Sequence, residues 1–392
     1  MSISSWLLIV VGLFGHTALW ISTVNRLHGT GLRRLYVKSI TAVVNAWLLL
    51  FPLGLVWLVW QAQGESAGAA RLSGPLVTGY LGLCSLFALF HYPYWLWRRA
   101  KQTKDTALLS HSTRVVNISD IAAPPLIAGL RAQVCRFVPG NQLLRLHVEE
   151  KTLALPHLAP ELAGLSIAHV SDLHFTGRVT RAYFDAVVDL INDLDADMIA
   201  LTGDVCDKTD CVAWIEPTLG RLRSRLGAYF VLGNHDLRVD DVDGLRRTLD
   251  GAGLVDVSAV PRELDFKGQG ILLAGNERPW FRRSSEPPPL LDSSQPDRHE
   301  PLRILLSHSP DQFAWAQARQ FDLVLAGHTH GGQIRFPAIG PVVCPSLFGV
   351  TYAEGVFTGG DAVMHVSRGT CSMFPLRLGC PPELTRLVLV RG

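Results

Sequence analysis

The sequence predicts an α/β domain preceded by an all-α membrane region of three helices. Residues 1–104 carry nine Lys or Arg and one acid, a net charge of 9 − 1 = +8, whereas the rest of the chain carries 27 basic and 33 acidic side chains, a net charge of −6. Seven of the ten Trp precede residue 98, a density that is typical of membrane interfaces. From about Leu143, short apolar runs alternate with amphipathic stretches, as they do in α/β domains.

These shifts divide the chain into a membrane domain over 1–104, a connector over 105–142 and a soluble domain over 143–392. Because the charges of the two parts nearly cancel, the overall charge of +2 gives no indication of nucleic-acid binding. The connector contains a largely apolar stretch, Ile127–Val138, which two arginines interrupt. The sequence leaves open whether this stretch lies along the membrane surface.

Three uncharged stretches are long enough to cross a membrane. They have 19, 21 and 25 residues and cover Ser5–Thr23, Ile40–Trp60 and Ser73–Trp97. At about 1.5 Å per helical residue, each can span a hydrocarbon core of roughly 30 Å. A cleavable signal peptide is the alternative for the first stretch, but no basic residue precedes it and two further stretches follow it.

Basic residues predict the orientation in the membrane. They gather in the first loop (Arg26, Arg33, Arg34, Lys38) and after the third stretch (Arg98, Arg99, Lys101, Lys104), whereas the second loop has one Arg and one Glu. The positive-inside rule therefore places the N-terminus outside and the soluble domain of this multi-pass chain in the cytoplasm. Seven Cys without a CxxC pair fit free thiols in a reducing compartment, which agrees with that orientation.

The soluble domain has five short apolar runs that predict buried strands. They are Leu165–Val170, Met198–Thr202, Tyr229–Leu232, Ile304–Leu306 and Leu323–Ala326. Thr180 can cap a helix with apolar residues at helical spacing, so the first two runs form a strand, helix, strand crossover. Pro310 similarly suits the first turn of a helix that runs to about Arg319.

Metal-binding side chains follow each of these runs. The five segments are Asp172-Leu173-His174, Gly203-Asp204-Val205-Cys206-Asp207, Gly233-Asn234-His235-Asp236, Ser307-His308 and Gly327-His328-Thr329-His330. Open α/β sheets place ligand sites beyond the carboxyl ends of their strands, so we expect these segments to meet at one rim. Each segment alone has an ordinary structural explanation, such as a turn for Gly-Asn-His-Asp. Their ordered conjunction favours a metal centre.

The residue types indicate which metals fit. Carboxylates, an Asn carbonyl and several imidazoles form a mixed oxygen and nitrogen set, which suits divalent Mn, Fe, Zn or Co better than metals that prefer thiolates. An Asp can bridge two ions through its two oxygens, whereas an Asn adds a neutral ligand. Two ions about 3.5 to 4 Å apart can activate a water and clamp an in-line displacement at phosphorus.

At these residues the sequence resembles the calcineurin-like metallophosphoesterase superfamily, because its blocks D-x-H, G-D-x-x-D, G-N-H-D/E, a lone His and G-H-x-H are all present in order. The resemblance covers roughly Leu143–Gly392. The run GHTHGGQ at Gly327–Gln333 and the later SRG and GCPPEL segments are similar to the bacterial membrane-associated phosphodiesterase branch, which includes lipid A pathway UDP-diacylglucosamine pyrophosphohydrolases. The resemblance implies a four-layer αββα sandwich and a bacterial-type inner membrane.

The resemblance also implies roles for individual residues. Two divalent metal ions are implied, the first bound by Asp172, His174, Asp204 and His330, the second by Asp204, Asn234, His308 and His328. His235 would stabilise or protonate the leaving oxygen, Asp236 would orient its ring, and Asp207 would lie just outside the ligands. The sequence departs from the branch after Ser367-Arg368-Gly369, where Thr370-Cys371-Ser372 replaces a further glycine-rich step. This departure changes the surface expected to contact the substrate, and it changes none of the expected metal ligands.

Substrate contacts are expected from a charged, proline-rich insertion at Glu277–Glu300. Arg278, Trp280 and Arg282 can form a lid that binds a phosphate and an apolar group; a solvated surface loop is the alternative. Arg178 and Arg368 are further candidate phosphate contacts.

The leading functional hypothesis is a membrane-anchored two-metal phosphoesterase whose partners are the lipid bilayer and a phosphoester. Its substrate is expected to be a lipid-linked phosphodiester or pyrophosphate such as UDP-diacylglucosamine, because a tether concentrates the site at one surface. A broad phosphodiesterase on soluble substrates and a catalytically silent membrane sensor or scaffold are the alternatives.

Overall fold

The structure is a computed structural model that describes residues 2–64, 74–102, 106–288 and 300–392. The chain forms two compact units, residues 1–104 and residues 105–392. Residues 289–299 of the expected insertion at Glu277–Glu300 lie outside the described residues.

The N-terminal unit consists of α1 (Ile3–His28), α2 (Arg34–Gly64) and α4 (Pro75–Gln102). Each helix contains an 18-residue window that is long and apolar enough to cross a membrane, with mean hydropathies of 1.9, 2.2 and 1.3 in chain order. Only 11–22% of each window is buried, so most of the apolar side chains face outward, as they do against lipid. The three predicted helices are confirmed.

Helices α1 and α4 pack closely because glycine lies at their contact. A Cβ atom at Gly15 would lie 1.8 Å from the carbonyl oxygen of Cys84. Polar side chains bond between the helices: His16 Nδ1 lies 2.7 Å from the Tyr80 hydroxyl, which also accepts the Trp20 indole N–H at 2.8 Å. His16 therefore has partners inside the helix bundle, the ordinary situation for a polar residue among apolar helices.

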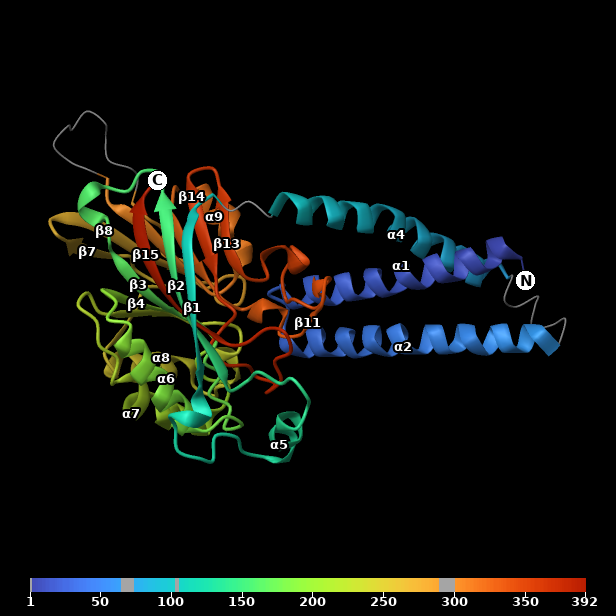
Figure 1. The fold of residues 1–392 in the computed structure, drawn as a ribbon, viewed down its shortest axis with the longest axis horizontal. Helices are drawn as coiled ribbons and strands as arrows, with labels where there is room; N and C mark the ends of the chain where they lie inside the picture. Colours follow the sequence, from blue (N-terminus) through green and yellow to red (C-terminus); the bar gives the residue numbers. More distant parts are fainter. Residues whose placement is uncertain (1, 65–73, 103–105, 289–299) are drawn as a thin grey trace. The chain divides into compact units, whose positions relative to one another are not determined.

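The C-terminal unit is built on two sheets (Figure 1). The first consists of β1 (Leu108–Asn117), β2 (Arg145–Leu155), β15 (Glu383–Arg391), β3 (Ser166–Val170), β4 (Met198–Thr202), β5 (Ala228–Val231) and β6 (Leu254–Asp256), in that spatial order. The second consists of β13 (Gly355–Gly359), β14 (Ala362–Val366), β10 (Leu323–Ala326), β9 (Leu302–Ser307), β8 (Gln269–Asn276) and β7 (Arg262–Phe266). β11 (Arg335–Phe336) and β12 (Gly340–Pro341) form a separate hairpin.

The helices cover the outer faces of the two sheets. They are α6 (Arg181–Asp193), α7 (Ile215–Leu219) and α8 (Val242–Gly251) on the first sheet and α9 (Phe313–Gln317) on the second. Successive strand residues point to opposite faces, so Ile199 packs against helices while its neighbour Ala200 packs between the sheets. The resulting order of helices, sheet, sheet and helix confirms the expected four-layer αββα fold.

The predicted secondary structure agrees closely with the structure. The expected runs Met198–Thr202 and Leu323–Ala326 coincide with β4 and β10 at both ends. Thr180 takes the N-cap position of α6, but its hydroxyl donates to the Pro125 carbonyl instead of capping the helix. Pro310 begins a 3₁₀ turn, and α9 after it ends at Gln317, two residues before the expected end.

The expected connector over 105–142 is wrong for most of its length. β1 pairs antiparallel with β2 from Leu108 opposite Leu153 to Asn117 opposite Arg145, so this segment belongs to the C-terminal unit. The segment also contributes α5 (Leu130–Arg136). β1 is an edge strand with mostly exposed side chains, so it lacks the apolar alternation that marks a half-buried strand.

Strand direction brings the expected metal-binding segments together. β3, β4 and β5 run parallel in the first sheet, and β9 and β10 run parallel in the second. Their carboxyl ends therefore lie at shared edges of the two packed sheets. The residues that follow these strands form the site described below.

Candidate metal centre

The backbone at this edge is unusual. Five of the expected ligands have left-handed φ angles, between 52° and 70°; these are Asp172, His174, Asp204, His328 and His330. For residues other than glycine this conformation is sparsely populated, and it persists where the surroundings hold it, commonly at functional sites. The loops after the strands are therefore held in one conformation by their packing.

Two glycines allow the strand ends to approach. A Cβ atom at Gly327 would lie 1.8 Å from Ser171 Oγ, and one at Gly233 would lie 2.3 Å from Asp204 Oδ1. Both distances are far below a van der Waals contact, so any side chain at either position would displace the loops beside it. The glycines of the Gly-Asn-His-Asp and Gly-His-Thr-His motifs thus serve close packing.

The first expected ligand group is assembled. Donor atoms of Asp172, His174, Asp204 and His330 all lie within 4.8 Å of one another. His174 Nε2 lies 3.0 Å from His330 Nε2 and 3.6 Å from Asp204 Oδ2. His330 Nε2 lies 3.3 Å from Asp172 Oδ1. Four side chains from three strand ends therefore point to a common position.

The second expected group lies on the other side of Asp204. His308 Nε2 lies 3.3 Å from Asp204 Oδ2 and 3.2 Å from Asn234 Oδ1, and His328 has a donor atom within 4.8 Å of Asp204 and His308. One oxygen, Asp204 Oδ2, thus faces both groups. This is the geometry expected of a bridging carboxylate.

The hydrogen bonds of Nδ1 show which nitrogen of each histidine faces the ligand groups. His308 Nδ1 lies 2.7 Å from the Thr202 carbonyl, which can only accept, so Nδ1 carries a proton and Nε2 is the nitrogen that faces the oxygens of Asp204 and Asn234 and can bind a cation there. His174 Nδ1 likewise donates to Asp207 Oδ2 at 2.7 Å, so Nε2 is the nitrogen that faces the first ligand group. Among the described residues, buried Asp172 Oδ1 has no hydrogen-bond partner.

Such a convergence of lone pairs is unfavourable unless a cation lies among them, and the donor set suits a divalent metal. The pKa of His308 reflects the same requirement, because a proton on Nε2 is the alternative to a metal ion at this position. Burial lowers this pKa, but the Asp204 carboxylate outweighs burial and raises it to about 9. Burial also raises the pKa of Asp204, yet the neighbouring histidines hold it well below its usual value.

Asp207 holds two histidines at once. Its Oδ2 accepts from His174 Nδ1, and its Oδ1 lies 2.5 Å from His235 Nδ1. Burial raises the pKa of Asp207, but the two histidines more than compensate and lower it below its usual range. Asp207 therefore fixes the ring of one expected ligand and the ring of the expected acid.

The role expected for Asp236 is wrong, because its oxygens do not face the His235 ring. Oδ1 accepts the backbone N–H groups of Val205 and Cys206 at 2.9 and 2.8 Å, and Oδ2 accepts that of Gly233 at 2.8 Å. Burial and the nearby Asp204 charge raise the pKa of Asp236 to about 7. Asp236 instead ties the loop after β4 to the loop after β5.

Two arginines at the site were not predicted. Arg238 Nη1 donates to Asp207 Oδ1 at 2.6 Å, and Nη2 lies 3.0 Å from His235 Nε2. Arg377 is fully buried behind His330 and donates to its carbonyl at 3.1 Å. Arg238 follows Asp236 by two residues, a proximity that could have indicated it, whereas nothing in the sequence near Arg377 marks a buried guanidinium.

The structure places the expected substrate contacts in different surroundings. Trp280 lies at the site, with its ring centroid 4.6 Å from that of His328 and 5.5 Å from that of His308. Arg278 and Arg282 are exposed on the same segment, and their contact with substrate stays a prediction. Arg178 donates to the Met373 carbonyl at 2.7 Å.

Arg368 is less suited to bind phosphate than expected. Its side chain is 13% exposed and contacts Glu149, Glu354 at 3.3 Å and Glu383 at 3.1 Å. Lys151 joins this group through an ion pair of 2.8 Å with Glu383. The charge of Arg368 is thus compensated within the protein, and its guanidinium supports the fold between the sheets.

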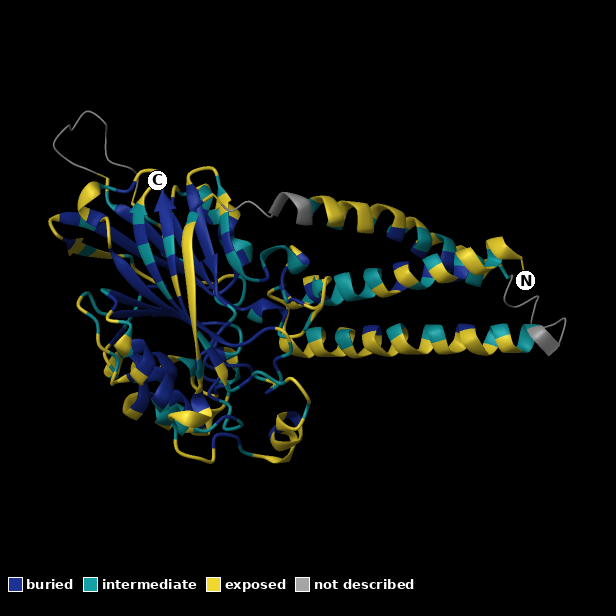
Figure 2. Cartoon of the chain, viewed as in Figure 1, coloured by how far each residue is buried: buried dark blue, intermediate teal, exposed yellow. Residues whose placement is uncertain are grey.

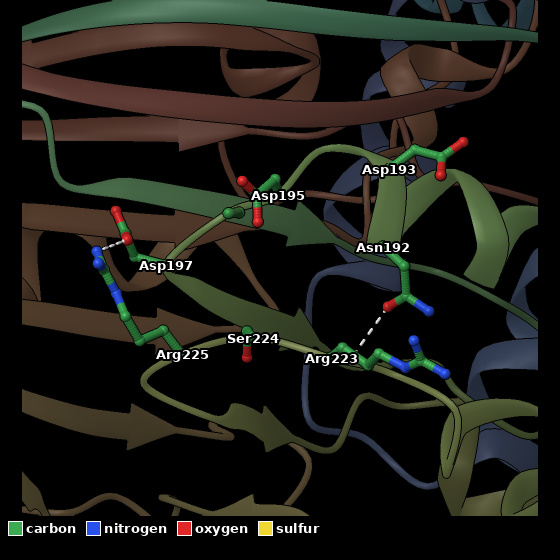
Figure 3. A pocket seen from close by; sticks show the side chains of 8 residues that line it. Asn192, Asp193, Asp195, Asp197, Arg223, Ser224 and Arg225 are labelled. Atoms are coloured by element: carbon green, nitrogen blue, oxygen red, sulfur yellow. Dashed lines mark hydrogen bonds and ion pairs between the residues drawn. The ribbon is translucent and has the colours of Figure 1, made fainter.

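A surface hollow of about 560 Å³ lies elsewhere, between α6 and β4 (Figure 3). It is lined by Asn192, Asp193, Asp195, Ala196, Asp197, Arg223, Ser224 and Arg225. Asp197 directly precedes β4, so the hollow is at the opposite end of this strand from Asp204. Its Asp197 pairs with Arg225, and Asn192 Oδ1 accepts the Arg223 backbone N–H at 2.9 Å. The hollow is separate from the ligand groups.

Comparisons with known proteins agree with this geometry. Residues 165–332 match the family described as Calcineurin-like phosphoesterase. The chain is 30% identical to Phosphodiesterase YaeI from Escherichia coli (strain K12), over 58% of this chain and 83% of that protein. It is 29% identical to a Transmembrane protein with metallophosphoesterase domain from Bos taurus, over 96% of this chain and 86% of that protein. It is 28% identical to Uncharacterized metallophosphoesterase YkuE from Bacillus subtilis (strain 168), over 69% of this chain and 93% of that protein.

Proposed function

The chain belongs to the calcineurin-like phosphoesterase family and is a phosphoester hydrolase, and we propose that it is a membrane-anchored, two-metal enzyme that cleaves a lipid-linked phosphodiester or pyrophosphate. The position of Asp204 supports the two-metal part, because its Oδ2 lies 3.6 Å from His174 Nε2 and 3.3 Å from His308 Nε2. The first group would hold one ion and the second group the other. Mn, Fe, Zn and Co are the metals that this donor set fits.

Two divalent ions, when bound, would polarise phosphoryl oxygens and favour ionisation of an attacking water. The protein itself holds the metal ligands in place and positions a proton donor for the leaving oxygen. Asp207 keeps the Nδ1 proton of His235, so Nε2 is the nitrogen that can hold a proton for the leaving oxygen. The Asp207 carboxylate also stabilises the positive charge that His235 gains when Nε2 is protonated.

Arg238 has a second function in this scheme. Its guanidinium lies between Asp207 and His235 Nε2, and its side chain is 18% exposed. A phosphate oxygen entering beside His235 would offer this guanidinium a charged acceptor in place of the imidazole nitrogen. Arg238 would then bind the substrate and leave His235 Nε2 free for proton transfer.

The lipid-linked substrate rests on two observations. Three helices are long and apolar enough to span a membrane, more than a soluble substrate requires, and a tether raises the effective concentration of the site toward molecules in the same surface. Trp280 adds an apolar ring beside His328, which suits a substrate with an apolar group next to its phosphate. We propose a bacterial-type inner membrane as the location of the chain. The catalytic unit would lie in the cytoplasm, because basic loops favour the cytoplasmic side of a membrane.

A broad phosphodiesterase that acts on soluble esters is the alternative. A catalytically silent sensor or scaffold is disfavoured, because the seven expected ligands and His235 are all present at the site. The experiment is hydrolysis by the full chain, loaded with each of Mn, Fe, Zn and Co in turn. Mixed micelles would contain UDP-diacylglucosamine or phospholipids, and bis(p-nitrophenyl) phosphate would serve as the soluble ester.

We expect the lipid-linked pyrophosphate to be cleaved faster than the soluble ester. Cleavage of the soluble ester alone, at a rate that detergent and lipid leave unchanged, would contradict the lipid-linked substrate and favour the alternative. The Asp204→Ala chain is the control, and its metal content is measured in parallel, because activity in a preparation that has lost its metal comes from a contaminant.

A further inference from the structure

Helix α5 has an exposed apolar face. Leu130, Val134 and Phe137 recur at helical spacing and are 77%, 60% and 81% exposed, whereas Ala132 and Cys135 on the opposite face are buried (Figure 2). An isolated exposed apolar residue is ordinary, but an apolar stripe on a helix that is already anchored by its other face indicates an interaction.

Further apolar residues are exposed near the metal centre. Phe336 and Ile339 in the β11–β12 hairpin are 52% and 51% exposed, and Phe374 is 44% exposed. The hairpin begins five residues after His330, an expected metal ligand. We call Leu130, Val134, Phe137, Phe336, Ile339 and Phe374 together the apolar rim.

Hydrogen bonds connect the three segments of the apolar rim. The Asn141 side chain donates to the Cys135 carbonyl of α5 at 2.9 Å and to the Pro375 carbonyl at 3.0 Å. The Gln333 side chain donates to the Phe374 and Leu376 carbonyls at 2.7 and 2.8 Å. α5, the loop at Phe374 and the start of the hairpin are therefore one connected structure beside the metal centre.

The segments that carry the rim also lack negative charge. Residues 121–148, 331–353 and 369–382 contain no Asp or Glu. They contain arginines, of which Arg131 and Arg136 are exposed on α5 on either side of its apolar face. An apolar stripe flanked by arginines is typical of helices that lie in the interface of an anionic membrane, where the apolar face enters the acyl boundary and arginines reach the head groups.

We propose that the apolar rim docks the catalytic unit on the anionic lipid surface, so that the metal centre opens beside the head groups. The inference rests on the proposed function for its purpose, which is delivery of a lipid-linked phosphoester. A second copy of the chain is a poorer occupant, since two such surfaces would bring arginines together without an acidic partner. β1 begins six residues after α4 ends, and so short a connection to an apolar helix favours the lipid bilayer as the surface that the apolar rim contacts.

The test uses the full chain in nanodiscs of phosphatidylcholine and phosphatidylglycerol that contain a nitroxide-labelled lipid. Val134→Cys carries a fluorophore, and Val260→Cys is the matched control, because Val260 is 61% exposed against 60% for Val134 and lies outside the rim. The seven native cysteines are buried, so the introduced thiols label selectively. We expect several-fold stronger quenching at position 134 than at position 260.

A charge-reversed chain, Arg131→Glu with Arg136→Glu, should lose most of this quenching, since each arginine near an anionic surface changes partitioning by about fivefold. Equal quenching at both positions would overturn the proposal. Self-quenching at position 134 that depends on two copies in one nanodisc would also overturn it, in favour of a second chain. The quenching experiment contains no substrate, so its result is independent of the hydrolysis assay. Quenching in a chain that does not cleave the lipid-linked ester would contradict only the proposed substrate. Cleavage of that ester by a chain that shows no quenching would contradict only the docking.

Discussion

Asp207 Oδ1 lies 2.5 Å from His235 Nδ1, while the other oxygen of this carboxylate holds His174. One side chain therefore links the expected metal-binding machinery to the expected proton donor. Neither histidine can change its tautomer without disturbing the other, because both direct an N–H group at the same carboxylate.

The first prediction concerns this link. Asp207→Asn should lower metal affinity about 10- to 100-fold, because the amide is a weaker acceptor for His174. Turnover at saturating metal should fall as well, because His235 loses its carboxylate partner. Metal titration followed by kinetics at saturation separates the two effects. Unchanged turnover at saturation would show that His235 does not depend on Asp207.

The second prediction concerns the bridging oxygen. Asp204→Ala should abolish hydrolysis and reduce the number of bound metal ions, because Asp204 is the residue that faces both ligand groups. Elemental analysis of the purified full chain measures the metal. A variant with two bound ions and normal activity would rule out the bridging role.

The third prediction separates proton transfer from metal binding. His235→Ala should keep its metal and lose roughly 10²- to 10⁴-fold in turnover if His235 acts as a general acid. Arg238→Ala should instead raise KM more than it lowers kcat, because the guanidinium is placed to bind phosphate. Loss of metal in His235→Ala would overturn only the role of that histidine.

The fourth prediction concerns stability. Glu383→Ala should lower the free energy of unfolding by about 3–5 kcal/mol, because it leaves buried Lys151 and nearly buried Arg368 without this carboxylate. Glu150→Ala is the control, since its pair with Arg386 is half-exposed and such pairs contribute about 0–1 kcal/mol. Thermal unfolding of both chains in one detergent compares them, and equal midpoints would contradict the expected difference.

The fifth prediction concerns orientation. A reporter fused to the C-terminus that is active only outside the cytoplasm should stay silent, because basic residues gather in the first loop and after the third apolar helix. A reporter that fluoresces only in the cytoplasm should be bright on the same chain. The opposite pair of signals would invert the topology.

The sequence predicted the strands well, and the expected ligands lie together, for a physical reason. Each expected ligand follows a buried apolar run, so its place at the carboxyl edge follows from the run itself. Asp204 is an example, since Met198–Thr202 predicts both the strand and the side of the sheet where Asp204 lies.

Partners across distant loops could not be predicted in this way. Asp236 adjoins His235 in sequence, yet Asp207, 28 residues earlier, is the residue that contacts the ring. β1 was missed because an exposed edge strand needs no apolar alternation. Arg377 was missed because its partners are mostly carbonyls, which every residue carries.

The place of β15 in the first sheet has a consequence for biogenesis. β15 lies between β2 and β3, parallel to the one and antiparallel to the other, although it follows every other strand in the chain. During translation the β1–β2 pair therefore has no attachment to β3 until residues 383–391 emerge from the ribosome. The three apolar helices are made first, so their insertion into a membrane would precede closure of the catalytic unit. A nascent chain stalled before residue 383 would expose an open sheet edge to chaperones and proteases.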